Sequence, residues 1–312
     1  GAKDRPGGAT NVPSLRKVRG PQRVGPLRPV PSCGAFTHPD NETPHMTYAN
    51  ILVETKDGIA TLTLNRASSL NSLNMAIMED IRTALRALAK DESVKTLIVT
   101  GAGRGFCAGA DLTSTGGGDA TGRSVGEGIS HSMEIGYNPL VRDLAGFPKP
   151  VVVAVNGVAA GGGVGLALCG DIVIASKSAY FVQVFAPRLG LVPDMGCTWF
   201  FPQLLGRARS RALAMLGDRL PAEKAAEWGL IWQCVEDAQL MTEAMAIAQR
   251  LAKGPQIAYR ELKRVLDEAP FNTLDQQLEN ERRTQRVLGD TEDFREGVIS
   301  FLTKRDPNFK SK

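Results

Sequence analysis

The sequence has few of the residues that build metal, disulfide or nucleophilic chemistry. Its 312 residues include five cysteines and three histidines. The cysteines are odd in number and widely spaced, without a C-x-x-C pair, so neither a disulfide framework nor a zinc site is indicated, and a reducing, cytoplasmic setting fits best. His38 and His45 lie in the N-terminal stretch, which leaves His131 without the partners of a Ser–His–Asp triad.

Long apolar runs and excess charge are also missing from most of the chain. No run reaches the length that spans a membrane, so we expect no membrane contact. The net charge is +4, and all of it comes from residues 1–45, which carry seven Lys or Arg against three Asp or Glu. The remainder is balanced and has no basic stripe with aromatic residues in it, so we expect no nucleic-acid partner.

Residues 1–45 have the composition of a disordered segment. They contain eight of the 18 prolines and six glycines, with almost no apolar periodicity. Such a stretch cannot bury enough surface to offset its ordering entropy. We interpret it as a disordered leader or a non-native extension, with Met46 as the natural start. A transit peptide is an alternative, since the stretch is arginine-rich, but its prolines oppose an amphipathic helix.

The residues 149–166 organise the rest of the chain. Val151 to Val155 read as a buried strand, Asn156-Gly157 as a turn, and the glycines from Gly161 onward lie where a strand becomes a helix. Glycines there let a ligand touch the backbone, and the first helical turn offers unpaired N–H groups to a negative oxygen. Close packing of helix on strand is an alternative reason for the glycines. The spacing matches neither a dinucleotide-binding nor a P-loop motif.

Other segments alternate between strand and helix patterns. We expect a hairpin from Ile51–Glu54 and Ile59–Leu64, a helix over residues 75–89 capped by Asn74, and a mobile loop over 113–130. The predicted later strands are 96–100, 171–175 and 179–185. The predicted later helices are 133–144, 207–216, 222–228, 238–252, 257–266, 274–288 and 292–303.

A second glycine-rich segment, together with the first, indicates a resemblance to a known family. Residues 103–112, Gly-Arg-Gly-Phe-Cys-Ala-Gly-Ala-Asp-Leu, follow the strand at 96–100. Together with residues 149–166 they resemble the two signature motifs of the crotonase (enoyl-CoA hydratase/isomerase) superfamily, and the resemblance runs from about Met46 to Lys312. It implies an α/β fold of the ClpP/crotonase type, with a ββα superhelix over 46–245 and a helical region for trimerisation over 246–312. A homotrimer or a hexamer, as a dimer of trimers, is the implied assembly.

The same resemblance implies the residues of an acyl-CoA site. The backbone N–H groups of Ala110 and Gly162 would form an oxyanion hole for the thioester. The implied substrate-binding residues are Ala108, Asp111, Leu112, Tyr137 and Gly161, with Arg66 and Lys304 as candidates for the coenzyme A phosphates. No metal or redox cofactor is implied, because coenzyme A arrives as part of the substrate. Ordinary surface charges are an alternative for Arg66 and Lys304.

The available carboxylates select the reaction. Hydratases of the superfamily use two glutamates, and here these positions fall on Gly165 and near Phe185 or Ala186, in a segment that is one residue longer than usual. Between Val158 and Phe200 the acids are Asp171, which we expect to anchor a strand, and Asp194. Asp194 lies in the apolar stretch 190–196, which should raise its pKa into the range of a useful base. A turn aspartate after Pro193 is the alternative interpretation.

Asp194 coincides with the single acid of the superfamily's isomerases, and the chain most resembles those of phenylacetate degradation. The resemblance therefore implies an acyl-CoA isomerase with one Asp base, and Δ3,Δ2-enoyl-CoA isomerase activity is a further expectation. An enoyl-CoA hydratase of fatty-acid oxidation is the rival enzyme, opposed by Gly165. A non-catalytic or RNA-binding protein of the same fold is the rival from another class, opposed by the balanced charge after residue 45 and by the retained motifs.

Overall fold

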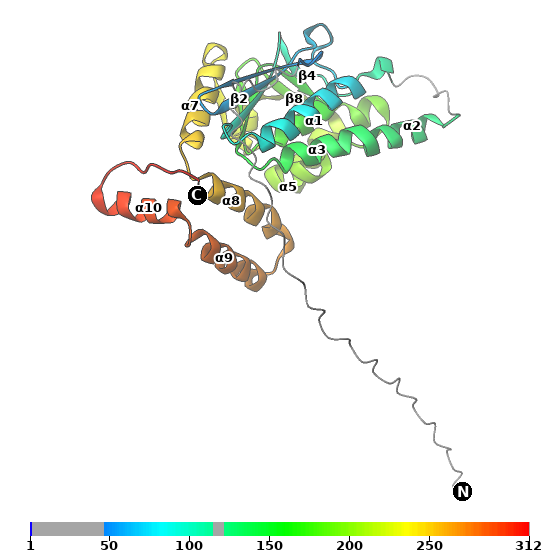
Figure 1. Cartoon of the computed structure of the whole chain (residues 1–312). Helices are drawn as coiled ribbons and strands as arrows, with labels where there is room; N and C mark the ends of the chain where they lie inside the picture. The colour runs from blue at the N-terminus through cyan, green and yellow to red at the C-terminus, as the bar shows by residue number, and fades with distance from the viewer. Residues whose placement is uncertain (2–46, 115–121, 312) are drawn as a thin grey trace, which may run out of the picture. The chain divides into compact units, whose positions relative to one another are not determined.

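The computed structural model describes Gly1, residues 47–114 and residues 122–311 (Figure 1). From Thr47 onward these residues form one compact unit. Apart from Gly1, the predicted disordered segment 1–45 lies outside the described residues. The glycine-rich centre of the predicted loop 113–130 also lies outside them.

Six of the described strands form the larger sheet, in the order β1-β2-β3-β5-β7-β10. β1 and β2 make the predicted antiparallel hairpin, and the remaining pairs are parallel. β3 and β5 in the middle are almost wholly buried, as expected for parallel strands covered on both faces. The bounds are β1 (Ile51–Lys56), β2 (Ile59–Leu64), β3 (Thr96–Gly101), β5 (Val151–Val155), β7 (Ile172–Ser176) and β10 (Gln233–Val235).

A smaller sheet lies at the glycine-rich segments and has the order β4-β6-β8-β9 among the described strands. Its bounds are β4 (Gly105–Cys107), β6 (Val158–Ala160), β8 (Tyr180–Val182) and β9 (Leu220–Pro221). The predicted strand 179–185 is wrong beyond Val182, because a π-helical turn, η4 (Phe185–Leu189), follows. A π turn holds more residues than an α turn, so it would accommodate the extra residue that the family resemblance implies for this segment.

Helices cover both faces of the larger sheet. α1 (Met75–Lys90) starts as predicted, with Asn74 Oδ1 accepting a hydrogen bond from the Ile77 N–H at 3.1 Å. The predicted helix 133–144 is longer in the structure, because the capping-box residue Ser124 starts α2 (Val125–Ser132) ahead of it. The chain continues through a π-helical turn, η3 (Met133–Tyr137), into α3 (Asn138–Ala145). α4 (Gly162–Leu168) is short and wholly buried.

The C-terminal part is helical, as predicted, and most bounds agree within two residues. The exception is α5 (Cys197–Leu216), which starts ten residues before the predicted helix 207–216 because it continues across a break at Gly206. The others are α6 (Ala222–Trp228), α7 (Leu240–Ala252), α8 (Gln256–Glu268), α9 (Leu274–Leu288) and α10 (Glu292–Thr303). None of the described helices is both long and apolar enough to cross a membrane.

Two apolar clusters hold these layers together. The larger one joins α1, α3 and α4 to one face of the sheet. The smaller one lies under α7, where Leu240, Ala244 and Ala248 pack against residues such as Ile98 and Val152. α8, α9 and α10 lie beyond this body and form a separate layer of helices (Figure 1). The glycine-rich segments are therefore fixed by the core, and the last three helices are not part of it.

Candidate active site

The loop after β4 is held against the segment that precedes α1. Leu73 N–H donates to the Gly109 carbonyl at 2.7 Å, and Asp111 N–H donates to the Leu73 carbonyl at 2.9 Å. These two hydrogen bonds use the Gly109 carbonyl and the Asp111 N–H, on either side of Ala110. The Ala110 N–H itself has no acceptor among the described residues. Ala110 N–H is therefore free to bind a ligand oxygen.

The start of α4 comes up against this loop. Gly109 has a φ of +85°, and a Cβ on it would lie 2.6 Å from the Ala160 carbonyl oxygen and 3.1 Å from the Gly162 nitrogen. Only glycine fits this close approach. Because Gly162 is the first residue of α4, its N–H has no acceptor within the helix, and it makes no hydrogen bond to other described residues. The two N–H groups that the resemblance implied are thus unused, and they lie on adjoining segments, Ala110 after β4 and Gly162 at the start of α4.

A cavity of about 110 Å³ opens beside these two N–H groups. Seven predicted site residues line it: Ala108, Ala110, Leu112, Tyr137, Gly161, Gly162 and Asp194. Sequence reasoning missed the rest of its wall, formed by Ile129, Ser132, Met133, Val184, Phe185, Leu189 and Leu191. Leu189 and Leu191 could have been inferred from the apolar stretch around Asp194. The residues of α2 and η3 gave no such signal, because only the fold brings them here.

Among the described residues, Asp194 is the acidic side chain in the wall of this cavity. Burial raises the pKa of its carboxyl to about 6, in the direction expected from the apolar sequence around it. Its Oδ1 atom is buried and has no hydrogen-bond partner among the described residues. A carboxyl group with this pKa is mostly ionised at pH 7 and can still hold a proton, which suits a general base.

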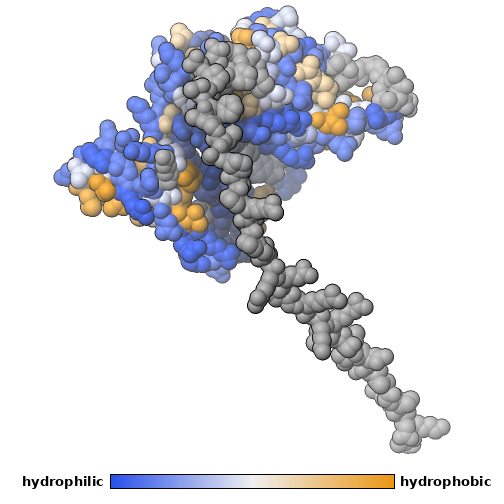
Figure 2. Space-filling view, viewed as in Figure 1, coloured by the Kyte–Doolittle hydropathy of each residue, from blue (hydrophilic) through white to orange (hydrophobic). Residues whose placement is uncertain are grey.

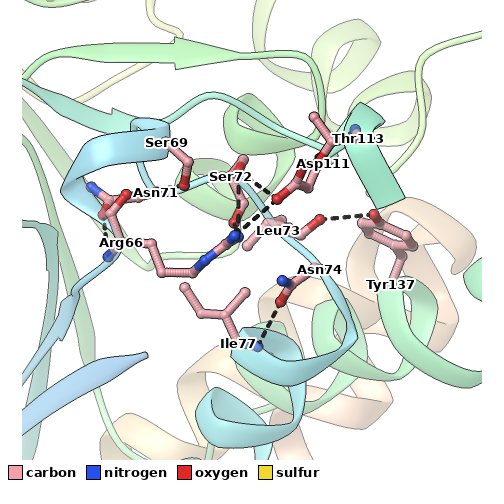
Figure 3. Close-up of polar contacts among 10 residues, drawn as sticks. All are labelled: Arg66, Ser69, Asn71, Ser72, Leu73, Asn74, Ile77, Asp111, Thr113 and Tyr137. Carbon is pink, nitrogen blue, oxygen red and sulfur yellow. Dashed lines mark hydrogen bonds and ion pairs between the residues drawn. The ribbon is translucent and has the colours of Figure 1, made fainter. Parts of the chain in front are cut away.

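Arg66 and Asp111 do not line the cavity but brace the loop behind Ala110 (Figure 3). Asp111 Oδ2 accepts from Arg66 Nη2 at 2.9 Å and from Ser72 Oγ at 3.2 Å, and its Oδ1 accepts from Thr113 Oγ1 at 2.6 Å. The Thr113 bond, the Arg66 bond and the Ser72 bond lower the pKa of Asp111 to about 2. The structure thus gives Arg66 a partner within the chain, and its contact with coenzyme A stays a prediction.

Tyr137 contacts the segment before α1 that holds this loop (Figure 3). Its hydroxyl donates to the Leu73 carbonyl at 3.1 Å, the same oxygen that accepts from Asp111 N–H. Burial, and then the charge of Asp194, raise the pKa of Tyr137 to about 12, so the hydroxyl stays protonated. Lys304 follows α10 and does not line the cavity, so its predicted contact with coenzyme A remains untested.

Cys107 and Asp171 lie in surroundings that indicate structural roles. Burial raises the pKa of the Cys107 thiol to about 12, which keeps it protonated and unreactive. Asp171 Oδ2 accepts from Val151 N–H at 2.7 Å and from Lys263 Nζ at 2.8 Å, so it anchors β5 as expected. Within the described ranges no cluster of three or more His, Cys, Asp or Glu is placed to hold a metal.

The two free N–H groups of the glycine-rich segments, with one carboxyl lining the same cavity, agree with a family match over most of the chain. The sequence profile of the enoyl-CoA hydratase/isomerase family matches residues 54–312. This chain belongs to that family. Acyl-CoA substrates follow from the membership.

Relatives and solved structures of the family cover the same residues. The chain is 49% identical to the 1,2-epoxyphenylacetyl-CoA isomerase of Escherichia coli, over 84% of this chain and 98% of that protein. It is 33% identical to the crotonyl-CoA hydratase of Syntrophomonas wolfei, over 86% and 100%. The crystal structure of an enoyl-CoA hydratase from Bacillus anthracis superposes with a TM-score of 0.78 at 31% identity, over 84% and 100%. The expected crotonase fold is thereby confirmed.

Proposed function

We propose that this enzyme is an acyl-CoA isomerase that acts on 2-(1,2-epoxy-1,2-dihydrophenyl)acetyl-CoA and forms the oxepin-CoA. The observation that carries the proposal is the single carboxyl of Asp194 in the cavity beside the two N–H groups. The 49% identity to the 1,2-epoxyphenylacetyl-CoA isomerase of Escherichia coli supports the choice of acyl group. Δ3,Δ2-Enoyl-CoA isomerisation is proposed as a second activity of the same site.

The proposed mechanism uses one base and one oxyanion hole. Ala110 and Gly162 donate their N–H groups to the thioester oxygen, and each donor stabilises the developing negative charge by about 3 kcal/mol. For a 3-enoyl-CoA, the Asp194 carboxylate takes a proton from C2, and the electrons of that C–H bond move toward the thioester oxygen. The protonated Asp194 then returns the proton to C4, the double bond ends between C2 and C3, and no atom is gained or lost.

Hydration of 2-enoyl-CoA is the second candidate reaction, because the relatives of this chain include a crotonyl-CoA hydratase. Water addition needs a group that activates the water as well as one that delivers a proton. Among the described residues Asp194 is the acid in the cavity wall, and Gly165 has no side chain. These observations favour isomerisation over hydration.

The test compares three substrates on the same preparation. We expect the wild type to convert the epoxide and, at a lower rate, a 3-enoyl-CoA, and to hydrate a 2-enoyl-CoA least. The Asp194→Asn variant serves as the blank for contaminating activity. A wild type that hydrates faster than it isomerises would replace the proposal with the hydratase alternative. A protein that converts none of the three would contradict both.

We also propose that the enzyme assembles as a homotrimer or as a dimer of trimers. The C-terminal helices expose large apolar side chains (Figure 2), among them Phe271 at 72%, Leu274 at 74% and Phe301 at 83%. Apolar surface of this extent is typical of an interface between subunits. Light scattering should give three or six times the 33.4 kDa mass of the chain. A monomer at micromolar concentration would contradict the assembly and leave the proposed reaction standing.

A further inference from the structure

Met195, next to Asp194, has a backbone that is unusual for its residue type. Its φ is +52°, in the left-handed region that favours glycine, and Gly196 follows with a φ of +80°. Met195 is also only 1% exposed. A non-glycine residue in this conformation is uncommon and persists where the surrounding packing fixes it.

The packing partners of Met195 are two glycines of α4, one helical turn apart. A Cβ on Gly162 would lie 3.0 Å from Met195 Cγ and 3.2 Å from Asp194 Oδ1. A Cβ on Gly165 would lie 2.2 Å from the Met195 carbonyl oxygen and 2.6 Å from Met195 Cβ. The missing side chains of Gly162 and Gly165 therefore leave a notch in α4, and Met195 fills it with both its backbone and its side chain.

This notch bears directly on how Asp194 is held. Asp194 Oδ1 has no hydrogen-bond partner among the described residues, so no polar contact fixes that end of the carboxyl group. The Asp194 carbonyl accepts from Cys197 N–H at 3.0 Å, which turns the chain into α5. The backbone next to the Asp194 side chain is therefore held mainly by the contact of Met195 with α4.

Two titratable groups interact electrostatically with Asp194, and both are neutral. Tyr137 comes from η3 and Cys197 from α5, and burial raises the pKa of each to about 12. Neither group supplies a positive charge that would orient the carboxylate. Apart from a hydrogen bond with the backbone of Asp194 itself, packing is left to position the carboxylate.

We propose that Met195 is the positioning residue of the base: seated in the notch formed by Gly162 and Gly165, it fixes the Asp194 carboxyl beside the Gly162 N–H and keeps water from the side that faces α4. This inference rests on the proposed role of Asp194 as the base. It assigns Gly165 a steric reason to be glycine, since any side chain there would displace Met195 and its neighbour.

The experiment replaces Met195 by Gly and, as a matched control, by Leu. Glycine adopts the left-handed backbone without strain but empties the notch, whereas leucine keeps most of the volume. For Met195→Gly we expect a loss of about tenfold or more in kcat with little change in KM, as for a misplaced catalytic group. Its kinetic pKa should fall from about 6 toward the ordinary 3.8, because water reaches the carboxyl. Met195→Leu should stay close to the wild type in both.

A second readout needs no turnover. The titration of Asp194 is followed as the pH-dependent difference in unfolding midpoint between each protein and its Asp194→Asn counterpart. If the wild type isomerises nothing but Met195→Gly moves this titration, the proposed function fails, whereas the influence of Met195 on the Asp194 carboxyl is supported. A Met195→Gly variant that folds, with an unchanged titration and pH profile, would overturn the role even if its kcat fell.

Gly165→Ala tests the same contact from the opposite side, in case Met195→Gly does not fold. The added Cβ must push the Met195 carbonyl away, so we expect the same direction of change in kcat and in the titration of Asp194. An alanine variant that keeps the wild-type kcat and titration would overturn the proposal, because the notch would then have no influence on the base.

Discussion

Asp194 and Asp171 are two carboxylates that differ in their hydrogen-bond partners. The surrounding protein raises the pKa of both. Asp171 lies in a wide cavity of about 830 Å³ beside α8, where Lys263 and the Val151 N–H bind it. Asp194 lies in the small cavity, with one oxygen buried and without a partner.

A raised pKa alone therefore does not mark a catalytic acid. A carboxylate bound by a cation and a backbone N–H has its proton-accepting positions occupied, and it serves to tie elements together. A carboxylate that is desolvated and unpaired is costly to the fold, so its retention beside two free N–H groups points to chemistry. The larger cavity is thus the less informative one, because its Asp171 is already bound by Lys263 and by the Val151 N–H.

The largest expected effect separates the two residues by rate. Asp194→Asn should lower the isomerisation rate by several hundred-fold or more, on the scale of a lost general base. Asp171→Asn should change it by less than about threefold, because the residue acts on stability. Parallel assays of both variants with a 3-enoyl-CoA or the epoxide check this. Equal losses would remove the distinction between base and anchor.

The second effect is a pH dependence of stability caused by Asp194. Its folded pKa of about 6 lies above the ordinary 3.8, so its contribution to stability is fully present below pH 3.8 and is lost as the pH rises through 6. Two pKa units correspond to about 3 kcal/mol. Between pH 4 and pH 8 the wild type should therefore lose about 3 kcal/mol of unfolding free energy relative to Asp194→Asn. Urea unfolding at several pH values measures this, and parallel curves would show that the carboxyl is not desolvated.

The third effect removes the partner of Asp171. Lys263 Nζ donates to Asp171 and also to the Phe147 and Lys149 carbonyls, so Lys263→Met removes the shared donor of three acceptors, of which the two carbonyl bonds are partly buried. We expect a loss of about 2–3 kcal/mol in unfolding free energy with the reaction rate little changed. Lys177→Met, which removes an exposed ion pair with Glu236, is the control, and we expect it to change the unfolding free energy much less because water screens exposed charges. A loss no greater than the control's would contradict the anchoring role.

The smallest effect concerns Asp111, the most fully bonded of the three acids. Its pKa of about 2 lies below the ordinary 3.8, so its contribution to stability is present above pH 3.8 and is lost as the pH falls through 2. Asp111→Asn should cost about 2 kcal/mol at pH 7, and this difference should shrink below pH 4, opposite in sign to the effect of Asp194. Unfolding of both proteins from pH 7 to pH 2 checks it. A difference that stays constant over this range would mean that the charge of Asp111 contributes nothing.

The sequence predicted most of the fold because its strongest patterns are local. The helix from Met75, the α9 and α10 bounds and the buried strand at 151–155 follow from periodicity and caps that the chain carries itself. The strands β4 and β6 escaped prediction, because three residues are too few for a period. The π-helical turn at 185–189 also escaped it, because its geometry depends on tertiary packing.

The candidate site divides in the same way. The available groups can be identified from the sequence: two glycine-rich segments, a single acid in an apolar stretch, and no side chain at Gly165. How these groups act together depends on the three-dimensional fold. Hydrogen bonds to Leu73 leave the Ala110 N–H free, the fold closes a cavity over Asp194, and Met195 fills the notch in α4. Spacing along the chain fixes chemistry and local shape, whereas desolvation and close contact arise only where distant segments meet.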